Sequence, residues 1–299
     1  TLMLAISALS GLAQAPDYPE RGVKIIVPYP PGAFNDTLGR TVAERLSRTY
    51  RHPVVVENRL GANTTLGNSV VAKAAGDPHF ILVTPLPFSA LPGLYGSNLP
   101  YDALKDFSPL VWAGSTNNVL VVKNDLPVNS VKEFIELAQK NPGKLNYAST
   151  GSGSSNHLSM ELFMKMTGVK LAHIPYKGSA PAVTALIAGE VDAFFDNLPN
   201  VLPHIRAGKM KALAVTGRAR AVQLPDLPTV AEAGVPGYDV TVWFGMQIVA
   251  ILRDPEIVAR FRQSGVEVVA STPDEFAAQV RSEIAKWTQL IREANIRIE

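Results

Sequence analysis

Short apolar runs rich in β-branched residues alternate along the chain with segments whose apolar positions recur at helical spacing. Strands and helices that alternate at these separations form βαβ units, which build a mostly parallel sheet covered by helices. The pattern therefore predicts an α/β fold. In the first part of the chain the predicted strands are Val23–Pro28, Pro53–Val56 and Phe80–Thr84, and the predicted helices are Leu38–Tyr50 and Gly67–Ala75.

The same alternation continues through the middle of the chain. A predicted helix over Ser130–Lys140 begins with the capping-box pair Ser130 and Glu133, and Thr229 and Glu232 have the same spacing. The other predicted strands here are Leu145–Ala148, Lys170–Ile174, Val191–Asp196 and Ala212–Thr216, and the other predicted helices start near His157 and cover Ala180–Ala188 and Leu202–Ala207.

Two segments connect this middle part with the ends of the chain. Leu110–Lys123 contains two apolar runs separated by the polar residues Ser115–Asn118, and we interpret it as a crossing between domains. The β-like run Val240–Ala250 is expected to return to the first domain, with Trp243 and Phe244 in the core between the domains rather than forming a stacking platform. Two α/β domains joined by more than one crossing form a two-lobed, hinged fold. We predict one lobe over residues 16–117 and 240–299 and the other over 118–239, with C-terminal helices over Pro255–Ser264 and Pro273–Ala294.

Two turns of similar chemistry follow predicted strands. The first turn along the chain, Tyr29–Thr37, contains Gly32 and leads into a helix that Asn35 or Asp36 can cap. The second turn, Ser149–Asn156, is a run of small hydroxyl, amide and glycine residues that opens onto a helix. Such turns present unpaired backbone N–H groups and the positive end of a helix dipole, which bind anions such as carboxylates. Either turn alone could serve only to cap its helix, and the presence of two favours a ligand site.

Both turns are expected at the carboxyl ends of strands, where open α/β sheets bind their ligands. Two lobes that face each other would close both turns on one ligand. The ligand expected from this chemistry is a small organic carboxylate.

Composition excludes several other classes of function. The 299 residues carry a net charge of +2 with scattered basic residues, so no nucleic-acid partner is expected. The chain has no cysteine, which excludes thiol catalysis, thiolate metal sites and disulfides. The five histidines show no metal-ligand spacing, and no cofactor is expected. His173 and His204 are expected to be structural, and His52 and His79 to lie on the surface.

The N-terminus has the character of a targeting segment. Thr1–Ala15 is apolar and uncharged and ends in Ala13–Gln14–Ala15. This is typical of the end of a secretory signal peptide cleaved before Pro16, and it predicts a periplasmic protein. The alternative is an apolar N-terminal helix of the fold itself.

A series of short motifs runs in order along the chain: Tyr18–Pro19, Val27–Gly32 with Asp36, Val54–Arg59 with Gly61–Ala62 and Gly67, Leu99–Asp102, Lys105–Phe107, Asn141–Leu145, Ser149–Leu158, Pro175–Gly178, Phe195–Asn197, Pro203–Ile205, Leu213–Thr216, Pro228–Glu232 and Trp243–Gly245. Together they resemble the extracytoplasmic solute receptors of tripartite tricarboxylate transporters, the Bug or TctC-like family. The resemblance runs from about Tyr18 to Ile296, and its specificity comes from the number and order of the motifs.

The resemblance implies a two-lobed clamp of the periplasmic-binding-protein (Venus flytrap) type, with a mostly parallel sheet flanked by helices in each lobe. It implies that backbone N–H groups and ordered waters at the first turn hold a ligand carboxylate, while the second turn and the segment of Asp196 meet the other end. It also implies a monomeric receptor without enzymatic activity whose partner is an inner-membrane transporter of the tripartite tricarboxylate type. The candidate ligand-binding residues are Gly32, Ala33, Phe34, Asn35, Asp36, Thr84, Leu86, Ser149, Thr150, Gly151, Ser152, Gly153, Ser154, Ser155, His157, Tyr176 and Asp196.

The chain departs from the family pattern at two places. Ala33 and Phe34 stand where family members usually have small residues, often glycine. Phe34 would narrow the site or add an apolar wall, which disfavours citrate and favours aromatic carboxylates. Alternatively, its ring packs outward on Pro85–Phe88. Only Ile251–Asp254 stands where the family has a loop and a further helix.

A hydrolase acting on a small ester is the main alternative function. Its nucleophile, base and orienting acid would be Ser154 or Ser155, His157 and Asp196. The chain has no G-x-S-x-G nucleophile elbow, however. Asp196 could also act only as a helix cap. A periplasmic sensor partner would use the same cleft as a transport receptor, and the sequence does not separate the two.

Overall fold

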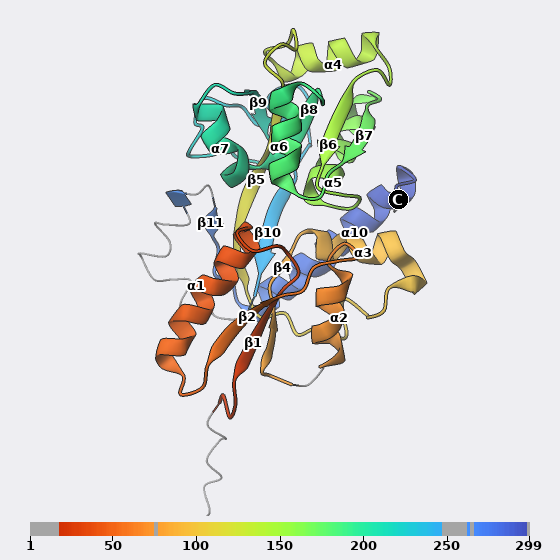
Figure 1. Ribbon diagram of the computed structural model, residues 1–299. Coiled ribbons are helices and arrows are strands. Elements are labelled where there is room, and N and C mark those ends of the chain that lie inside the picture. Colours follow the sequence, from red (N-terminus) through yellow and green to blue (C-terminus); the bar gives the residue numbers. More distant parts are fainter. Residues whose placement is uncertain (1–17, 75–76, 247–261, 264–265, 298–299) are drawn as a thin grey trace, which may run out of the picture.

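The computed structural model describes residues 18–74, 77–246, 262–263 and 266–297, which form an α/β structure of two lobes. In Figure 1 one lobe lies below the other, and long strands run between them. The signal-peptide prediction for Thr1–Ala15 and the short segment Ile251–Asp254 lie outside the described residues. So do the end of the strand predicted over Val240–Ala250 and all but residues 262–263 of the helix predicted over Pro255–Ser264.

The lower lobe is built on a parallel sheet with the strand order β2-β1-β3. The central strand β1 is the most deeply buried of the three, as expected of a strand covered on both faces. Helices α1 and α2 connect the strands as the two predicted βαβ crossovers. The bounds are β1 Val23–Val27, α1 Phe34–Thr49, β2 Val54–Asn58, α2 Thr65–Lys73 and β3 Phe80–Leu82.

Strand β5, Trp112–Val122, is shared by the two lobes. Its first half pairs antiparallel with β10 (Thr241–Gly245), and its second half pairs antiparallel with β8 (Ala193–Asn197) and β9 (Lys211–Val215). The change of partner falls within Ser115–Asn118. These polar residues therefore lie inside one continuous strand and do not separate two elements.

The upper lobe surrounds the second half of β5. Its strands follow the order β5-β8-β6-β7, in which β6 is parallel to both of its neighbours. Because β8 runs antiparallel to β5, the carboxyl ends of β6 and β8 point back toward the middle of β5 and the lower lobe. The bounds are α4 Val131–Lys140, β6 Asn146–Ser149, α5 Ser155–Thr167, β7 Ala172–Pro175, α6 Ser179–Ala188 and α7 Leu198–Arg206.

The chain returns to the lower lobe through β10, and α10 packs against α3. Helix α10 begins with the capping box formed by Thr272 and Glu275, and Pro273 lies in its first turn. Phe276 and Trp287 are buried on its inner face. The remaining bounds are β4 Thr84–Pro85, α3 Pro87–Tyr95, the 3-10 helix η1 Gly96–Asn98, β11 Glu267–Val268 and α10 Pro273–Glu293.

The start of α1 differs from the prediction. The helix begins at Phe34 rather than at Leu38, and its N-cap is Ala33, which has no capping side chain. Asn35 and Asp36 therefore lie inside the first turn, and the prediction that one of them caps the helix is wrong. The difference matters for function because it moves the free helix start closer to Gly32.

One capping-box pair lies outside a helix, and one smaller prediction fails. Thr229 and Glu232 exchange both hydrogen bonds of a capping box, at 2.9 and 3.1 Å, in a segment that forms a turn. His79 is buried rather than on the surface, with 7% of its surface exposed, because its ring Nδ1 and backbone N–H both bind Asp77.

Strand β10 and helix α10 meet at Gly245, where a side chain would not fit. A Cβ at Gly245 would overlap the ring of Phe276. Gly245→Ala should therefore lower the free energy of unfolding by about 1–3 kcal/mol, measured by urea denaturation, because the core is already full. Gly22→Ala is the matched control, since a Cβ there would reach only ordinary contact with Pro53. Equal losses in the two variants would contradict this account of the packing.

Candidate functional site

The first turn lies between β1 and α1, at the end of the lower lobe that faces the upper lobe (Figure 1). Gly32 adopts a φ of 85°, in the left-handed region that favours glycine. No side chain caps α1, so the N–H groups of its first turn, including those of Asn35 and Asp36, are left for other partners. Together with the positive end of a helix of 16 residues, they can bind an anion.

Asp36 holds this turn in shape. Its Oδ2 accepts hydrogen bonds from the Gly32 N–H at 3.0 Å and from Arg40 Nε at 2.9 Å, and its Oδ1 accepts one from Asn58 Nδ2 at 2.9 Å. Burial alone would raise the pKa of Asp36, but these donors and the Arg40 charge outweigh burial and lower the pKa. The carboxylate is thus ionised and committed to the fold.

Beside the first turn, the structure buries polar atoms for which it shows no partner among the described residues. They include Asn35 Oδ1 and Thr84 Oγ1, on side chains of residues only 7% and 8% exposed. The half-buried ring of Phe34 packs on Phe244, with the ring centroids 4.6 Å apart. Phe244 pairs with Pro85 across the sheet. The Phe34 ring therefore lies next to Pro85–Phe88, the segment named above as its alternative contact.

The second turn lies between β6 and α5 and is shaped by its own hydroxyl groups. Ser154 is the N-cap of α5, and its Oγ accepts a hydrogen bond from the His157 N–H at 3.3 Å. The helix therefore begins two residues before the predicted start at His157. Ser149 Oγ accepts a hydrogen bond from the Gly151 N–H at 3.0 Å. The N–H groups of Gly151, Gly153 and His157 are thus used inside the protein. Those of Ser155 and Asn156 in the first turn of α5, together with the helix dipole, can bind an anion.

His157 is a buried neutral base beneath this turn. Its Nδ1 accepts a hydrogen bond from the Gly153 N–H at 3.1 Å, and its ring stacks on that of His173 with centroids 4.4 Å apart. Burial, followed by the charge of His173, lowers the pKa of His157 to about 3. The Nδ1 lone pair is therefore available at neutral pH and holds Gly153 in place.

Asp196 connects three helices of the upper lobe and is 1% exposed. Its Oδ1 accepts hydrogen bonds from Asn156 Nδ2 at 2.9 Å and from the Asn197 N–H at 2.8 Å, and its Oδ2 accepts one from the Ser179 hydroxyl. Burial raises the pKa of Asp196 to about 6, although these hydrogen bonds act in the opposite direction. Both oxygens are used inside the protein, and Asn197 rather than Asp196 is the N-cap of α7.

The side chains of the alternative hydrolase do not form a catalytic relay. The two ring nitrogens of His157 face the Gly153 N–H and Glu161, whose Oε1 lies 3.6 Å from Nε2. Asp196 binds the groups described above, and Ser154 Oγ faces the backbone of His157 and not its ring. Neither the proposed orienting acid Asp196 nor the proposed nucleophile Ser154 therefore contacts the His157 ring as a triad requires.

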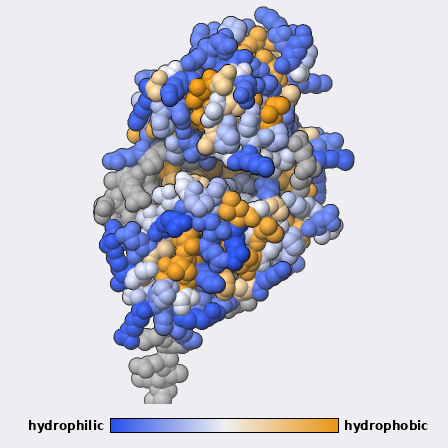
Figure 2. Space-filling model, in the orientation of Figure 1, coloured by the Kyte–Doolittle hydropathy of each residue, from blue (hydrophilic) through white to orange (hydrophobic). Residues whose placement is uncertain are grey.

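Both turns meet the loop between β2 and α2. Asn58, at the end of β2, donates from Nδ2 to the carbonyl of Tyr29 at 2.9 Å, beside the first turn. Asn63 donates from Nδ2 to the carbonyl of Ser152, in the second turn, at 2.9 Å. The end of β2 and the loop that follows it therefore contact the two turns at the junction of the lobes, where Figure 2 shows a hollow in the surface.

Sequence reasoning did not single out Asn63 or Asn118. Asn118 lies fully buried in the middle of β5, and its Nδ2 donates to Ser159 Oγ at 3.0 Å and to the Ser155 carbonyl at 3.3 Å. It thereby ties the shared strand to the start of α5. The available signal was a polar group, Ser115–Asn118, between two apolar β-runs, since amide residues are uncommon in buried strands unless their side chains have specific partners.

The remaining predicted site residues lie at different depths. Leu86 is fully buried in the hydrophobic core, whereas Tyr176 is half-buried and its N–H donates to the Ser149 carbonyl at 2.9 Å. Trp243 and Phe244 are 0% and 1% exposed and belong to the same core, which confirms the expectation that they are not a stacking platform.

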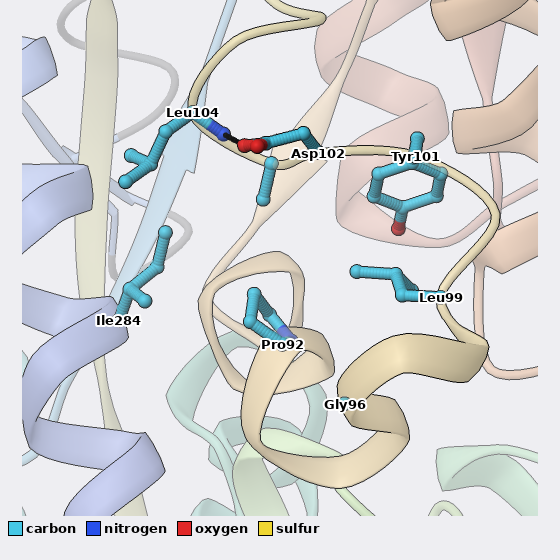
Figure 3. Close-up of a pocket in the computed structure, with 8 residues that line it drawn as sticks. Pro92, Gly96, Leu99, Tyr101, Asp102, Leu104 and Ile284 are labelled. Atoms are coloured by element: carbon cyan, nitrogen blue, oxygen red, sulfur yellow. Dashed lines mark hydrogen bonds between the residues drawn. The ribbon is translucent and has the colours of Figure 1, made fainter.

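A separate pocket of about 470 Å³ lies in the lower lobe, between α3, residues 99–104 and α10 (Figure 3). Leu99, Leu104 and Ile284 give it apolar walls. Asp102 also lies in the wall and accepts a hydrogen bond from the Leu104 N–H at 2.9 Å. A carboxylate in the wall disfavours an anionic ligand, so this pocket does not compete with the two turns as the carboxylate site.

Within the described part of the chain, no group of three or more His, Cys, Asp or Glu side chains is placed to hold a metal ion. Over the same residues, every helix is too short or too polar to cross a bilayer.

Comparison with known proteins agrees with this geometry. The family described as tripartite tricarboxylate transporter family receptor, TctC, matches residues 38–296. Protein BugT of Bordetella pertussis is 33% identical, with 100% of this chain and 97% of BugT covered. A solved R. palustris protein with adipate is 35% identical with a TM-score of 0.84, covering 94% of this chain and 99% of that one. The solved periplasmic binding protein BugD is also 35% identical, with a TM-score of 0.83 and coverages of 94% and 100%.

These similarities extend over nearly the whole of each pair of chains, and the solved structures share the two-lobed fold. The family match alone spans well over half of the chain. The chain therefore belongs to the TctC family of tripartite tricarboxylate transporter receptors.

Proposed function

We propose that this protein binds a small organic mono- or dicarboxylate between its lobes in the periplasm and delivers it, unchanged, to an inner-membrane transporter of the tripartite tricarboxylate type. The observation that carries the proposal is the convergence of two helix starts on one junction, joined through Asn58 and Asn63. The related structure with adipate supports a dicarboxylate as the ligand. The receptor acts as a monomer.

The two helix starts suit the two ends of such a ligand. The N–H groups of Asn35 and Asp36 bind one carboxylate, and the second turn binds the other carboxylate or a polar tail. A helix start contributes roughly 0.3–1 kcal/mol to each such charge without a formal cation. These positions are held in place by residues whose side chains hydrogen-bond within the protein: Asp36, Ser149, Ser154, His157 and Asp196. The residues that we place around the ligand are Gly32, Ala33, Phe34, Asn35, Thr84, Thr150, Gly151, Ser152, Gly153, Ser155 and Tyr176.

The division of the chain into lobes follows from β5. We place residues 16–117 and 240–299 in one lobe and residues 118–239 in the other. The strand register supports this division, because Asn117 lies opposite Thr241 and Asn118 lies opposite Asn197. Rotation of the lobes about this point would open and close the junction between the two turns.

The first prediction concerns the ligand class. In a thermal-shift and calorimetry panel, adipate and related acids should raise the melting temperature by mass action, whereas the uncharged diamide of adipic acid should not. Gly32→Ala should weaken acid binding, because a side chain at φ 85° distorts the first turn. Gly143→Ala is the matched control, since its φ of 71° is similar and the residue lies after α4. Equal binding of acid and diamide, or turnover of a panel member, would overturn the proposal.

A second prediction concerns Phe34, which we expect to border the ligand with the exposed part of its ring. Benzoate- and phthalate-like acids should then bind more tightly than citrate, by about 0.5–1.5 kcal/mol from ring contact. Phe34→Ala should weaken the aromatic acids several-fold and leave small aliphatic acids unchanged, as measured by calorimetry. Phe107→Ala removes a half-buried ring elsewhere in the lower lobe and serves as the control. An unchanged preference in Phe34→Ala would exclude Phe34 as a selectivity residue.

A third prediction concerns pH and Asp196. The pKa of Asp196 is raised from 3.8 to about 6 by folding, so the folded protein binds this proton more tightly than the unfolded chain does. The stabilisation from this proton is therefore complete below about pH 4 and is lost as the pH rises through 6.

Asp196→Asn keeps the hydrogen-bonding shape but cannot titrate. The difference in free energy of unfolding between wild type and Asp196→Asn should therefore change by up to about 3 kcal/mol between pH 4 and pH 7. Urea denaturation across this range measures it, with the exposed Asp226→Asn as the control. A difference that does not vary with pH would show that burial does not penalise the Asp196 charge.

A further inference from the structure

The loop between β2 and α2 contains a run of unusual backbone conformations. Ala62, Asn63 and Thr64 adopt φ values of 45°, 49° and 72°, in the left-handed region that alanine and threonine rarely enter. The carbonyl of Ala62 accepts hydrogen bonds from the Thr65 N–H at 3.0 Å and from the Tyr95 hydroxyl at 3.4 Å. Such conformations persist only where surrounding contacts fix them, and they are concentrated at binding and switch regions.

This run directs the side chain of Asn63 at the other lobe. Its Nδ2 donates to the Ser152 carbonyl at 2.9 Å, and both residues are half-buried. The next residue, Gly153, adopts a φ of 79°, and a Cβ there would lie 2.9 Å from Asn63 Nδ2 and would overlap Leu94. The second turn therefore fits against the lower lobe because Gly153 has no side chain.

We propose that Asn63 is a latch between the lobes. It holds the second turn against the lower lobe, which raises the closed fraction of the ligand-free protein and slows the release of a bound ligand that Asn63 does not touch. The part concerning ligand release rests on the proposed function, whereas the closed fraction does not.

A second contact between the lobes is weaker. Lys165 of α5 forms an ion pair with Glu293 of α10, but the two side chains are 41% and 43% exposed. Exposed ion pairs contribute little because water and salt screen them. A half-buried hydrogen bond at the junction, by contrast, changes a two-state equilibrium by about three- to tenfold. When only a small fraction of the ligand-free protein is closed, a fall in that fraction raises the apparent Kd for the ligand by the same factor.

The test uses the absence of native cysteine. Spin labels on Lys73→Cys of α2 and Ile174→Cys of β7, both exposed and in different lobes, report the distance between the lobes. The ligand-free protein should show a closed population. Asn63→Gly should lower the ratio of closed to open protein about three- to tenfold. Glycine removes the amide while tolerating the φ of 49°. Lys165→Gln is the control and should leave the distances unchanged.

The second measurement is the dissociation rate of adipate, used as the probe. Asn63→Gly should raise this rate about three- to tenfold, and Asn63→Asp should raise it further because its carboxylate faces the Ser152 carbonyl. Distances that are unchanged in ligand-free Asn63→Gly would overturn the latch, as would a wild type with only the open distance. Weaker adipate binding with unchanged distances would instead make Asn63 a ligand contact. If adipate does not bind, the distance measurement still decides the latch, while the proposed function loses its support.

Discussion

The hydrogen bonding of β5 is the constraint on which the arrangement of both lobes depends. A buried strand must pair its backbone N–H and C=O groups along its whole length. β5 does so with β10 and β11 in one lobe and with β8 and β9 in the other. The point at which it changes partners fixes where the carboxyl ends of β6 and β8 lie, and therefore where the second turn faces the first. The position of the site thus follows from backbone pairing before any side chain of the site is considered.

Behind the two turns, the protein uses buried polar groups in place of exposed charges. His157 holds Gly153 as a neutral base, Asn118 ties β5 to α5, and Asp196 collects donors from three helices. Each of these groups is almost inaccessible to solvent, so its hydrogen bonds are strong and costly to break. The result is a fixed support for N–H groups whose direction determines what they bind.

Much of this arrangement could be predicted from the sequence because it depends on local patterns. The strands of the lower lobe, the capping box at Thr272 and the two glycine-containing turns all have local signals in the sequence. The start of α1 was predicted too late in the chain because its N-cap, Ala33, has no capping side chain that a sequence pattern could detect. The Asn63–Ser152 contact joins residues 89 positions apart, and the buried state of His79 depends on tertiary packing. Features of this kind depend on tertiary contacts, such as that of His79 with the Tyr18 ring, which no local pattern encodes.

In the proposed site, the first turn holds a carboxylate through main-chain N–H groups. Every residue except proline supplies such a group, so a substitution that keeps the shape of the turn leaves this anchor in place. Positions such as Ala33 and Phe34 can then vary in size and polarity while the fold and the anchor are inherited unchanged. A receptor built in this way can acquire a new ligand through single substitutions, and gene duplication followed by such changes can supply a bacterium with many receptors from one scaffold.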